Sequence, residues 1–211
     1  MINTFKTIKT EVHFKNKVGL CRFYGSASPA TTVEEANKFI QKIRDLYPDA
    51  THHVWAYKIG INENTILRYS DDGEPANSSG PPVSKAIEGN DLTNIAVVIT
   101  RYYGGVNQGV GGLIRAYGRT ASKTISETKI IENEAFQIVE VKPVEYNQLG
   151  DVIHHVEKLK GSIKNIVYDA NVKIIALLKP QDIDKFKTLI RDLTRGVAEI
   201  SLGEFVWQEI K

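Results

Sequence analysis

The fold is decided by residues 69–112, which read YSDDGEPANSSGPPVSKAIEGNDLTNIAVVITRYYGGVNQGVGG. Three carboxylates and a proline occupy the first turn, and the continuous apolar run Ile95–Ile99 predicts a buried central strand. Five glycines follow that strand and lead into a helix that carries Arg115 and Arg119. Each glycine costs backbone entropy on folding, so such a cluster indicates a tight turn or a close backbone approach. This stretch is therefore the first place to look for function.

The rest of the first 131 residues predicts an α+β domain. Thr32 and Glu35 have the spacing of a capping box at the start of a helix, and Pro48 ends that helix. The polar segment Lys15-Asn16-Lys17 predicts a turn between the first two strands, and residues 25–29 predict a loop. Strands are expected at 5–12, 18–24, 51–59, 66–70 and 94–100, with helices at about 32–46, 81–89 and 113–128.

From residue 135 onward the pattern changes to a regular alternation of strands and helices. Strands are expected at 136–141, 162–168, 172–178 and 199–208, with helices at about 145–160 and 181–194. The turn Asp169-Ala170-Asn171 joins the two middle strands, and the order βαββαβ is that of a ferredoxin-like domain. The chain is thus predicted to be an α+β protein of two domains, 1–131 and 135–211, joined by the linker Glu132-Asn133-Glu134.

Composition excludes several classes of protein. The 211 residues are 42% hydrophobic and 25% charged, as in ordinary globular proteins, and no run approaches the length of a membrane span. No apolar signal core is present near the start, so we expect a cytoplasmic protein without a membrane partner. The single cysteine, Cys21, excludes an internal disulfide and a multi-cysteine metal site.

The charge is unevenly distributed along the chain. Residues 1–131 carry 16 Lys and Arg against 12 Asp and Glu, a net +4, whereas residues 132–211 carry 11 against 13, a net −2. An anionic partner is therefore drawn to the first domain more than to the second. Neither value reaches the strongly basic charge of a dedicated duplex-DNA binder.

The glycine segment is a candidate site for an anion or a nucleic acid. Free amide groups and the helix dipole attract anions where a strand and a glycine-rich turn lead into a helix. Arg115 and Arg119 lie on one helical face, where Arg101 is expected to join them, and Tyr102 offers a ring for base stacking. The candidate residues are Arg101, Tyr102, Gly104, Gly105, Gly109, Gly111, Gly112, Arg115 and Arg119. The alternative is that the glycines only permit close packing. The segment matches neither nucleotide-binding glycine motif, so no cofactor is expected.

The carboxylates Asp71, Asp72 and Glu74 allow two interpretations. In the first interpretation they bind a hard cation or act as acid and base. In the second they follow a turn and accept hydrogen bonds from neighbouring amide groups. No regular ligand spacing accompanies them, so we assign no metal and no catalytic residue. His52 and His53 alternate along a strand and point to opposite faces, so only one of them can approach the carboxylate turn.

Three motifs together resemble the IMPACT/YigZ family. They are Ala50-Thr51-His52 with Ala56-Tyr57, Tyr69-Ser70-Asp71-Asp72-Gly73-Glu74-Pro75, and the run from Thr100-Arg101-Tyr102-Tyr103-Gly104-Gly105 through Gly109-Val110-Gly111-Gly112-Leu113-Ile114-Arg115-Ala116-Tyr117-Gly118. The chain departs from the family pattern at Asn77-Ser78-Ser79 and at Asn107-Gln108. The motif residues that form a second candidate set are His52, Asp71, Asp72, Gly73, Glu74 and Pro75.

The resemblance implies both a fold and a class of function. It implies that the first domain has the two-layer α/β fold of a ribosomal-protein domain, RNase PH and translocase domain IV. The second domain is then similar to translocase domain V. Eukaryotic relatives regulate translation, so the expected function is a binding module for RNA or the ribosome, or for proteins of the translation machinery. A metal-assisted hydrolase built on the carboxylate turn and a protein-interaction adaptor are the alternatives. Oligomeric state stays open.

Overall fold

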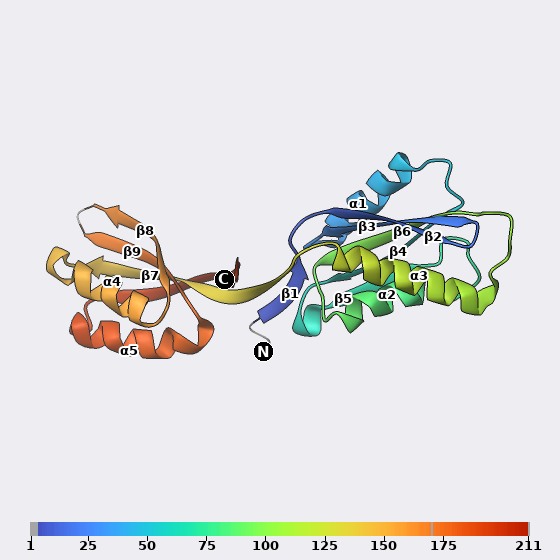
Figure 1. Ribbon diagram of the computed structural model, residues 1–211. Coiled ribbons are helices and arrows are strands. Elements are labelled where there is room, and N and C mark those ends of the chain that lie inside the picture. The colour runs from blue at the N-terminus through green and yellow to red at the C-terminus, as the bar shows by residue number, and fades with distance from the viewer. Residues whose placement is uncertain (1–3, 170, 211) are drawn as a thin grey trace. The chain divides into compact units, whose positions relative to one another are not determined.

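Strand β6 (Ile95–Tyr102) is the centre of the first sheet, and residues 95–101 are all buried. In the computed structural model, which describes residues 4–169 and 171–210, the sheet order is β2-β3-β6-β4-β5 with antiparallel neighbours throughout (Figure 1). The other strands are β2 (Val12–Val18), β3 (Cys21–Pro29), β4 (His52–Ile59) and β5 (Ile66–Ser70). The apolar run thus becomes the middle strand, as its composition predicts.

Helices cover both faces of this sheet. Helices α2 (Gly80–Gly89) and α3 (Gly109–Ser126) pack on one face and close the main core (Figure 1). Helix α1 (Val33–Leu46) packs on the other face through Phe39, Ile40 and Ile43. The predicted two-layer arrangement holds for the sheet with α2 and α3, and α1 adds a cover on the opposite side. At the start of α1, Thr32 Oγ1 accepts a hydrogen bond of 3.1 Å from the Glu35 amide, as the capping spacing predicts.

The first hairpin differs from the prediction. Lys15, Asn16 and Lys17 do not form a turn but lie inside β2, paired with residues of β3. The turn is the two-residue loop between Val18 and Cys21, and Gly19 has a φ of +59° there. A two-residue hairpin needs a left-handed residue, which glycine supplies without strain. The polarity of Lys-Asn-Lys is that of an exposed edge strand and does not indicate a turn.

The predicted loop at residues 25–29 is also wrong, because β3 continues to Pro29. Gly25 lies within the strand, directly under α3. A Cβ atom at this position would stand 1.8 Å from Thr124 Oγ1. The glycine is therefore there to let helix and sheet approach closely.

The second unit, Asn133–Lys211, is built on the order β10-β7-β9-β8. Its strands are β7 (Ile130–Val144), β8 (Ser162–Tyr168), β9 (Val172–Leu178) and β10 (Glu199–Glu209), and its helices are α4 (Leu149–Lys158) and α5 (Ile183–Leu193). The pairings among these four strands are all antiparallel. When the four strands are numbered in chain order, their order in the sheet is 4-1-3-2, as in a ferredoxin-like domain. The predicted linker at residues 132–134 lies inside β7, which begins in the first unit, Met1–Glu132. Ala170 of the predicted hairpin turn lies outside the described residues.

The remaining elements are short. Strand β1 (Thr4–Ile8) pairs with β7, which makes the second sheet five-stranded, and Lys6 also forms an isolated parallel bridge with Leu92. Single 3₁₀ turns occur at η1 (Asn62–Asn64), η2 (Tyr146–Gln148) and η3 (Pro180–Asp182). The α+β, two-domain fold predicted from the sequence is thus confirmed. Among the helices of the described residues, none is both long and apolar enough to cross a membrane.

Replacing Gly25 by Ala tests the close contact between β3 and α3. We expect Gly25→Ala to lower the free energy of unfolding by about 1–3 kcal/mol, because the new methyl group overlaps Thr124. Gly89→Ala is the matched control, since nothing lies within 4 Å of its Cβ position. Urea denaturation of both variants checks this, and equal stabilities would show that the helix moves away without cost.

Candidate functional site

The carboxylate segment forms a tight turn that sends its side chains in different directions. The Glu74 amide donates to the Asp71 carbonyl at 3.0 Å, and the two central residues have left-handed φ values, +46° for Asp72 and +87° for Gly73. Asparagine, aspartate and glycine are the residues that tolerate this conformation. As a result, each of the three carboxylates has its own set of partners.

Asp71 caps helix α2. Its Oδ1 accepts hydrogen bonds from the Ser79 amide and hydroxyl and from the Gly80 amide, and its Oδ2 accepts one from the Asn77 amide, all between 2.8 and 2.9 Å. Burial acts to raise the pKa of Asp71, but these hydrogen bonds outweigh it and lower the pKa below its ordinary value. Asp71 therefore has a structural role at the start of α2.

Asp72 joins three segments of the first unit. Its Oδ1 pairs with Arg44 of α1 at 2.5 Å, and its Oδ2 accepts from the His53 amide of β4 at 2.6 Å. Its main-chain carbonyl lies 2.8 Å from His52 Nδ1. Asp72 thus holds the carboxylate turn against the start of β4.

Glu74 is the centre of a buried polar cluster. Its Oε1 accepts from Arg101 Nη1 and from the Tyr117 hydroxyl, both at 2.6 Å, and the Glu74 side chain is only 3% exposed. Burial and the bond to Glu74 raise the pKa of Tyr117, so its hydroxyl stays protonated and donates. Burial acts to lower the pKa of Arg101, but the contacts with Cys21 and Glu74 raise it. The cluster is thus a charged pair with a neutral phenol attached.

His52 faces this cluster with one ring nitrogen. A carbonyl oxygen can only accept, so the contact with Asp72 places the proton of neutral His52 on Nδ1. His52 Nε2 then presents a lone pair, 3.9 Å from Glu74 Oε1. His53 points to the opposite face, where its Nδ1 contacts Thr100 Oγ1 at 3.1 Å and burial lowers its pKa. Of the two imidazole rings, only that of His52 therefore contacts the carboxylate turn, whereas His53 reaches it through its main-chain amide.

The glycine segment carries the chain from β6 to the start of α3. A Cβ atom on Gly104 would stand 2.3 Å from the Leu20 main chain, so the two backbones touch at this point. Gly105 and Gly109 have positive φ, and Gly111 and Gly112 lie in the first turn of α3. The N-cap residue Gln108 makes no side-chain capping bond, so the first amides of α3 carry no side-chain cap.

A pocket of about 570 Å³ opens where these elements meet, and we call it the α3 pocket. Its lining includes His52, Glu74, Arg101, Tyr103, Gln108 and Gly109. Two buried polar atoms of these residues, Arg101 Nε and Gln108 Oε1, have no hydrogen-bond partner in the described part of the chain. The structure thus brings together one motif histidine, the buried carboxylate and the glycine-rich helix start.

The predicted arginines do not share one face. The Arg101 side chain lines the α3 pocket but is 5% exposed and paired with Glu74, so the expectation that it joins Arg115 and Arg119 on one face is wrong. Its strand position points it at the main core, while Tyr102 points to the α1 face. Burial and a hydrogen bond to Asp49 raise the pKa of Tyr102 to about 12. Arg115 and Arg119 lie exposed on α3.

The carboxylate turn does not form a metal site. Within residues 4–169 and 171–210, no group of three or more His, Cys, Asp or Glu side chains is arranged to hold a metal ion. The reason is visible in the contacts, since Asp71 caps a helix, Asp72 pairs with Arg44 and Glu74 pairs with Arg101. This geometry does not favour the metal-assisted hydrolase.

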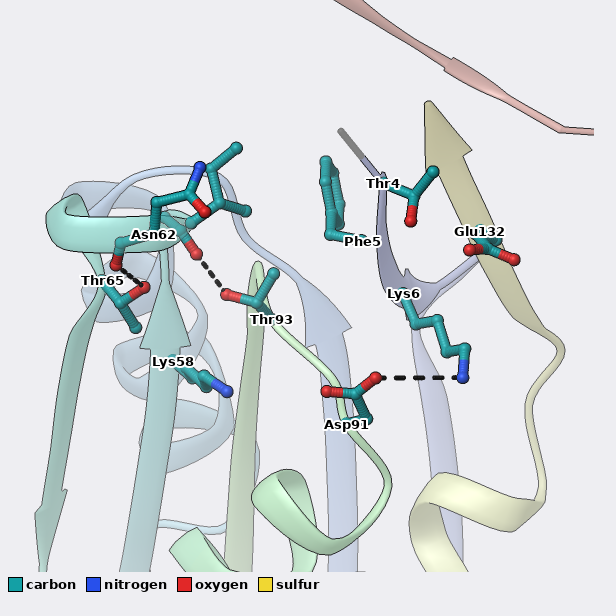
Figure 2. Close-up of a pocket in the computed structure, with 11 residues that line it drawn as sticks. Thr4, Phe5, Lys6, Lys58, Asn62, Thr65, Asp91, Thr93 and Glu132 are labelled. Atoms are coloured by element: carbon teal, nitrogen blue, oxygen red, sulfur yellow. Dashed lines mark hydrogen bonds and ion pairs between the residues drawn. The ribbon is translucent and has the colours of Figure 1, made fainter. Parts of the chain in front are cut away.

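Figure 2 shows a second pocket, of about 250 Å³, at the other end of β4. Its charged side chains balance, with Lys6 and Lys58 beside Asp91 and Glu132, and Lys6 Nζ lies 3.9 Å from Asp91 Oδ2. None of the buried atoms without a partner in the described residues belongs to its lining. It therefore offers weaker signs of a ligand than the α3 pocket.

The sequence patterns did not single out three residues of the site for a role in it. Tyr117 donates to Glu74, and a buried tyrosine hydroxyl needs such a partner, so that signal was available. Cys21 Sγ accepts a hydrogen bond from Arg101 Nη2 at 3.4 Å, which the sequence does not indicate. Gln108 stands out in the sequence only through the departure from the family pattern at Asn107-Gln108.

Comparison with known proteins identifies the family. The model of the Impact N-terminal domain matches residues 20–125, and that of a domain of unknown function, DUF1949, matches residues 144–197. The chain is 31% identical over 209 residues to IMPACT family member YvyE of Bacillus subtilis (strain 168), covering 99% of this chain and 95% of that protein. It is 30% identical over 180 residues to IMPACT family member YigZ of Escherichia coli (strain K12), covering 85% and 88%. A crystal structure of a hypothetical protein superimposes with a TM-score of 0.68 at 27% identity, covering 97% of this chain and 99% of that one.

These matches agree with the fold. The sheets and helices define a two-domain α+β protein. The chain belongs to the IMPACT family, as the motifs around the carboxylate turn and the glycine segment predict.

Replacing Asp71 by Asn tests the helix cap. We expect Asp71→Asn to lower the free energy of unfolding by about 1–2 kcal/mol, because the amide cannot accept at both positions. Because the folded-state pKa of Asp71 is lowered, its stabilisation is fully present above the ordinary carboxyl pKa and is lost as the pH falls through the folded-state value.

Urea denaturation over a pH series measures this effect. The difference between wild type and Asp71→Asn should shrink in acid. Asp91→Asn is the matched control, since the Asp91 side chain is 86% exposed and should change stability by no more than about 0.5 kcal/mol. A pH-independent difference would contradict the cap.

Proposed function

We propose that this protein is a non-enzymatic RNA-binding module that associates with the ribosome and takes part in regulating translation. The observation that carries the proposal is a set of cations that wraps around strand β2, at the edge of the first sheet. We call this set the cationic edge. It consists of Lys15, Lys17, Arg22, Arg115, Arg119 and Lys123.

The cationic edge is a continuous feature of the fold. Arg115, Arg119 and Lys123 follow one another at intervals of four residues along α3, and Lys123 Nζ lies 5.8 Å from the ring of Phe14 in β2. On the other face of the sheet, Lys15 and Lys17 of β2 stand opposite Tyr24 and Arg22 of β3. The α3 residues flank the edge strand on one side and the strand residues flank it on the other.

None of the six cations forms an ion pair with a carboxylate in the described part of the chain. The carboxylate just before β2, Glu11, is already engaged by Lys42 and His13. Free surface cations gain most when they meet phosphates, since binding releases condensed counterions. The charge distribution therefore suits a polyanion.

Edge-strand protection alone does not account for this pattern. Lysines on an edge strand prevent association with another sheet, and this explains Lys15 and Lys17. It does not require Arg115, Arg119 and Lys123, which lie on a helix that has no free backbone edge. The positive charge on α3, which edge protection does not explain, therefore favours binding of a polyanion.

Aromatic rings beside the cations favour single-stranded RNA over duplex DNA. The Arg22 guanidinium lies 4.9 Å from the Tyr102 ring, and Lys15 Nζ lies 5.7 Å from the Tyr24 ring. Rings paired with cations are typical of surfaces on which unpaired bases stack. The net +4 charge of residues 1–131 is modest, which also suits single strands. The resemblance to a translocase domain pair supports the ribosome as the source of that RNA.

The test is binding of a short, labelled single-stranded RNA, measured by fluorescence anisotropy from low to physiological salt. We expect Arg115→Ala/Arg119→Ala to weaken binding to RNA roughly tenfold at low salt. The slope of log affinity against log salt should fall by about 1.4, because each lost phosphate contact on a single strand contributes about 0.7.

The matched control removes two exposed cations from the opposite edge, Arg68 of β5 and Lys85 of α2. Arg68→Ala/Lys85→Ala lowers the net charge equally and should leave the affinity within about twofold of wild type. An equal loss of affinity in both double variants would show that the effect comes from net charge alone, which would contradict a role for the cationic edge. Absence of RNA binding in the wild type would reject the proposal. Co-sedimentation with ribosomes in the same salt series then tests the source of the RNA.

A further inference from the structure

Strand β5 forms an edge of the first sheet that lacks the usual protection against further pairing. It is the last strand in the order β2-β3-β6-β4-β5, and its pairing with β4 runs without a bulge from Ile66 to Ser70. Natural edge strands are blunted by lysines, prolines or bulges, because unpaired main-chain groups invite another strand. The opposite edge, β2, carries Lys15 and Lys17. Within one sheet, therefore, one edge is protected by lysines and the other is not.

Apolar side chains are exposed on both faces of β5. Ile66, Leu67 and Tyr69 are 41%, 37% and 45% exposed. Tyr69 stands opposite Ala56 of β4, a residue of the core beneath α2 and α3. Because side chains alternate along a strand, Tyr69 and Leu67 lie on the α2 face, and Ile66 lies on the α1 face with Arg68, the single charged residue of β5. Exposed apolar groups thus line a strand edge that pairs with no other strand of the described residues.

The geometry favours a second copy of the chain over an extended peptide. A peptide that adds to a sheet edge takes its specificity from pockets for alternate side chains. Neither the α3 pocket nor the pocket of Figure 2 has a lining residue in β5. A second β5 needs no such pocket, because its own row of exposed apolar side chains supplies the complement.

Two rules restrict how two copies of β5 can pair. A two-fold axis perpendicular to the sheet keeps each face continuous, so the axis must pass a residue that is paired with itself. Centring on Arg68 sets two like charges directly opposite each other, which is unfavourable. Centring on Ile66 or Tyr69 pairs fewer residues, because η1 ends at Asn64 before the strand and the carboxylate turn follows it. Centring on Leu67 avoids both problems.

The pairing about Leu67 joins residues 65–69 of the two copies, all of them extended. On the α2 face Leu67 meets Leu67 of the second copy, and each Tyr69 lies diagonal to it, within reach of an aromatic ring. On the α1 face each Arg68 stands opposite Ile66, which its apolar stem covers. Apolar groups meet apolar groups, so the strand complements itself.

We propose that this protein forms a two-fold dimer in which two β5 strands pair antiparallel about Leu67. The two five-stranded sheets then form one sheet of ten strands, with a cationic edge at each end. Neighbouring strands lie about 4.8 Å apart, so the two β2 strands are about 43 Å apart. The dimer does not depend on RNA binding. Where RNA binds the cationic edge, the dimer offers two such edges to one strand.

Sedimentation equilibrium of the full chain measures the dimer. We expect a Kd on the order of 10 μM, since a single strand pair is a small interface. Leu67→Lys places two ammonium groups opposite each other and should raise the Kd at least about tenfold. Leu202→Lys is the matched control, because Leu202 is also exposed but lies on β10 of the second sheet, and it should leave the Kd unchanged. Equal effects of both variants would overturn the proposal, as would a wild type that stays monomeric at about 200 μM.

Cysteine cross-linking tests the register. Leu67→Cys puts a thiol opposite its own copy, within the Cα separation that a disulfide requires. In Arg68→Cys the two thiols are offset by two residues along the strands, so their Cα atoms lie about 8 Å apart, too far for a disulfide. Native Cys21 is buried and does not compete.

We expect oxidised glutathione to convert Leu67→Cys to a covalent dimer faster than Arg68→Cys. Equal rates, or a faster reaction of Arg68→Cys, would overturn the pairing about Leu67. Leu67→Lys leaves the cationic edge intact, so it should bind the short RNA as wild type does. A monomeric wild type would therefore reject the dimer while RNA binding stands, and a dimer that binds no RNA would reject only the proposed function.

Discussion

The buried contact between Glu74 and Arg101 is the constraint on which the site depends. Taking two charged groups out of water costs several kcal/mol each unless partners satisfy them fully. Glu74 meets this cost with hydrogen bonds from Arg101 and the Tyr117 hydroxyl. These residues come from the turn after β5, from β6 and from α3. The pair therefore fixes three separate elements in register around one carboxylate.

The same pair decides the chemistry of the pocket beside it. Arg101 donates from one Nη to Glu74 and from the other to Cys21, and its guanidinium lies 5.8 Å from the Phe23 ring. Only Nε stays unsatisfied, so the residue is not a free cation for phosphate. The exposed positive charge of the cationic edge lies instead on the surface of α3, β2 and β3.

Local patterns predicted most of the elements but few of the partners. The apolar run at Ile95–Ile99 predicts the central strand, and the βαββαβ alternation predicts the ferredoxin-like order. Both predictions succeed because the period at which side chains are buried shows in residues that are adjacent in the sequence. The hairpin was misplaced because the charge of Lys15 and Lys17 outweighed the single glycine that makes the turn. The pairing of Glu74 with Arg101 spans 27 residues, and only the sheet register brings them together. Single-sequence periodicity holds no information on such contacts, so the glycine segment and its arginines were grouped on one face.

The α3 pocket and the cationic edge are built in different ways. In the proposed function the cationic edge binds any polyanion, because phosphate contacts carry no information about the sugar. The pocket walls are held by the Glu74 cluster and by Asp72, which anchors β4 to the carboxylate turn. His52 takes its tautomer from a main-chain carbonyl and not from a mobile side chain. The orientation of its Nε2 is therefore fixed before any ligand arrives. The pocket walls are thus set by hydrogen bonds within the domain, whereas the exposed cations of the edge make no ion pair with a carboxylate of the described residues.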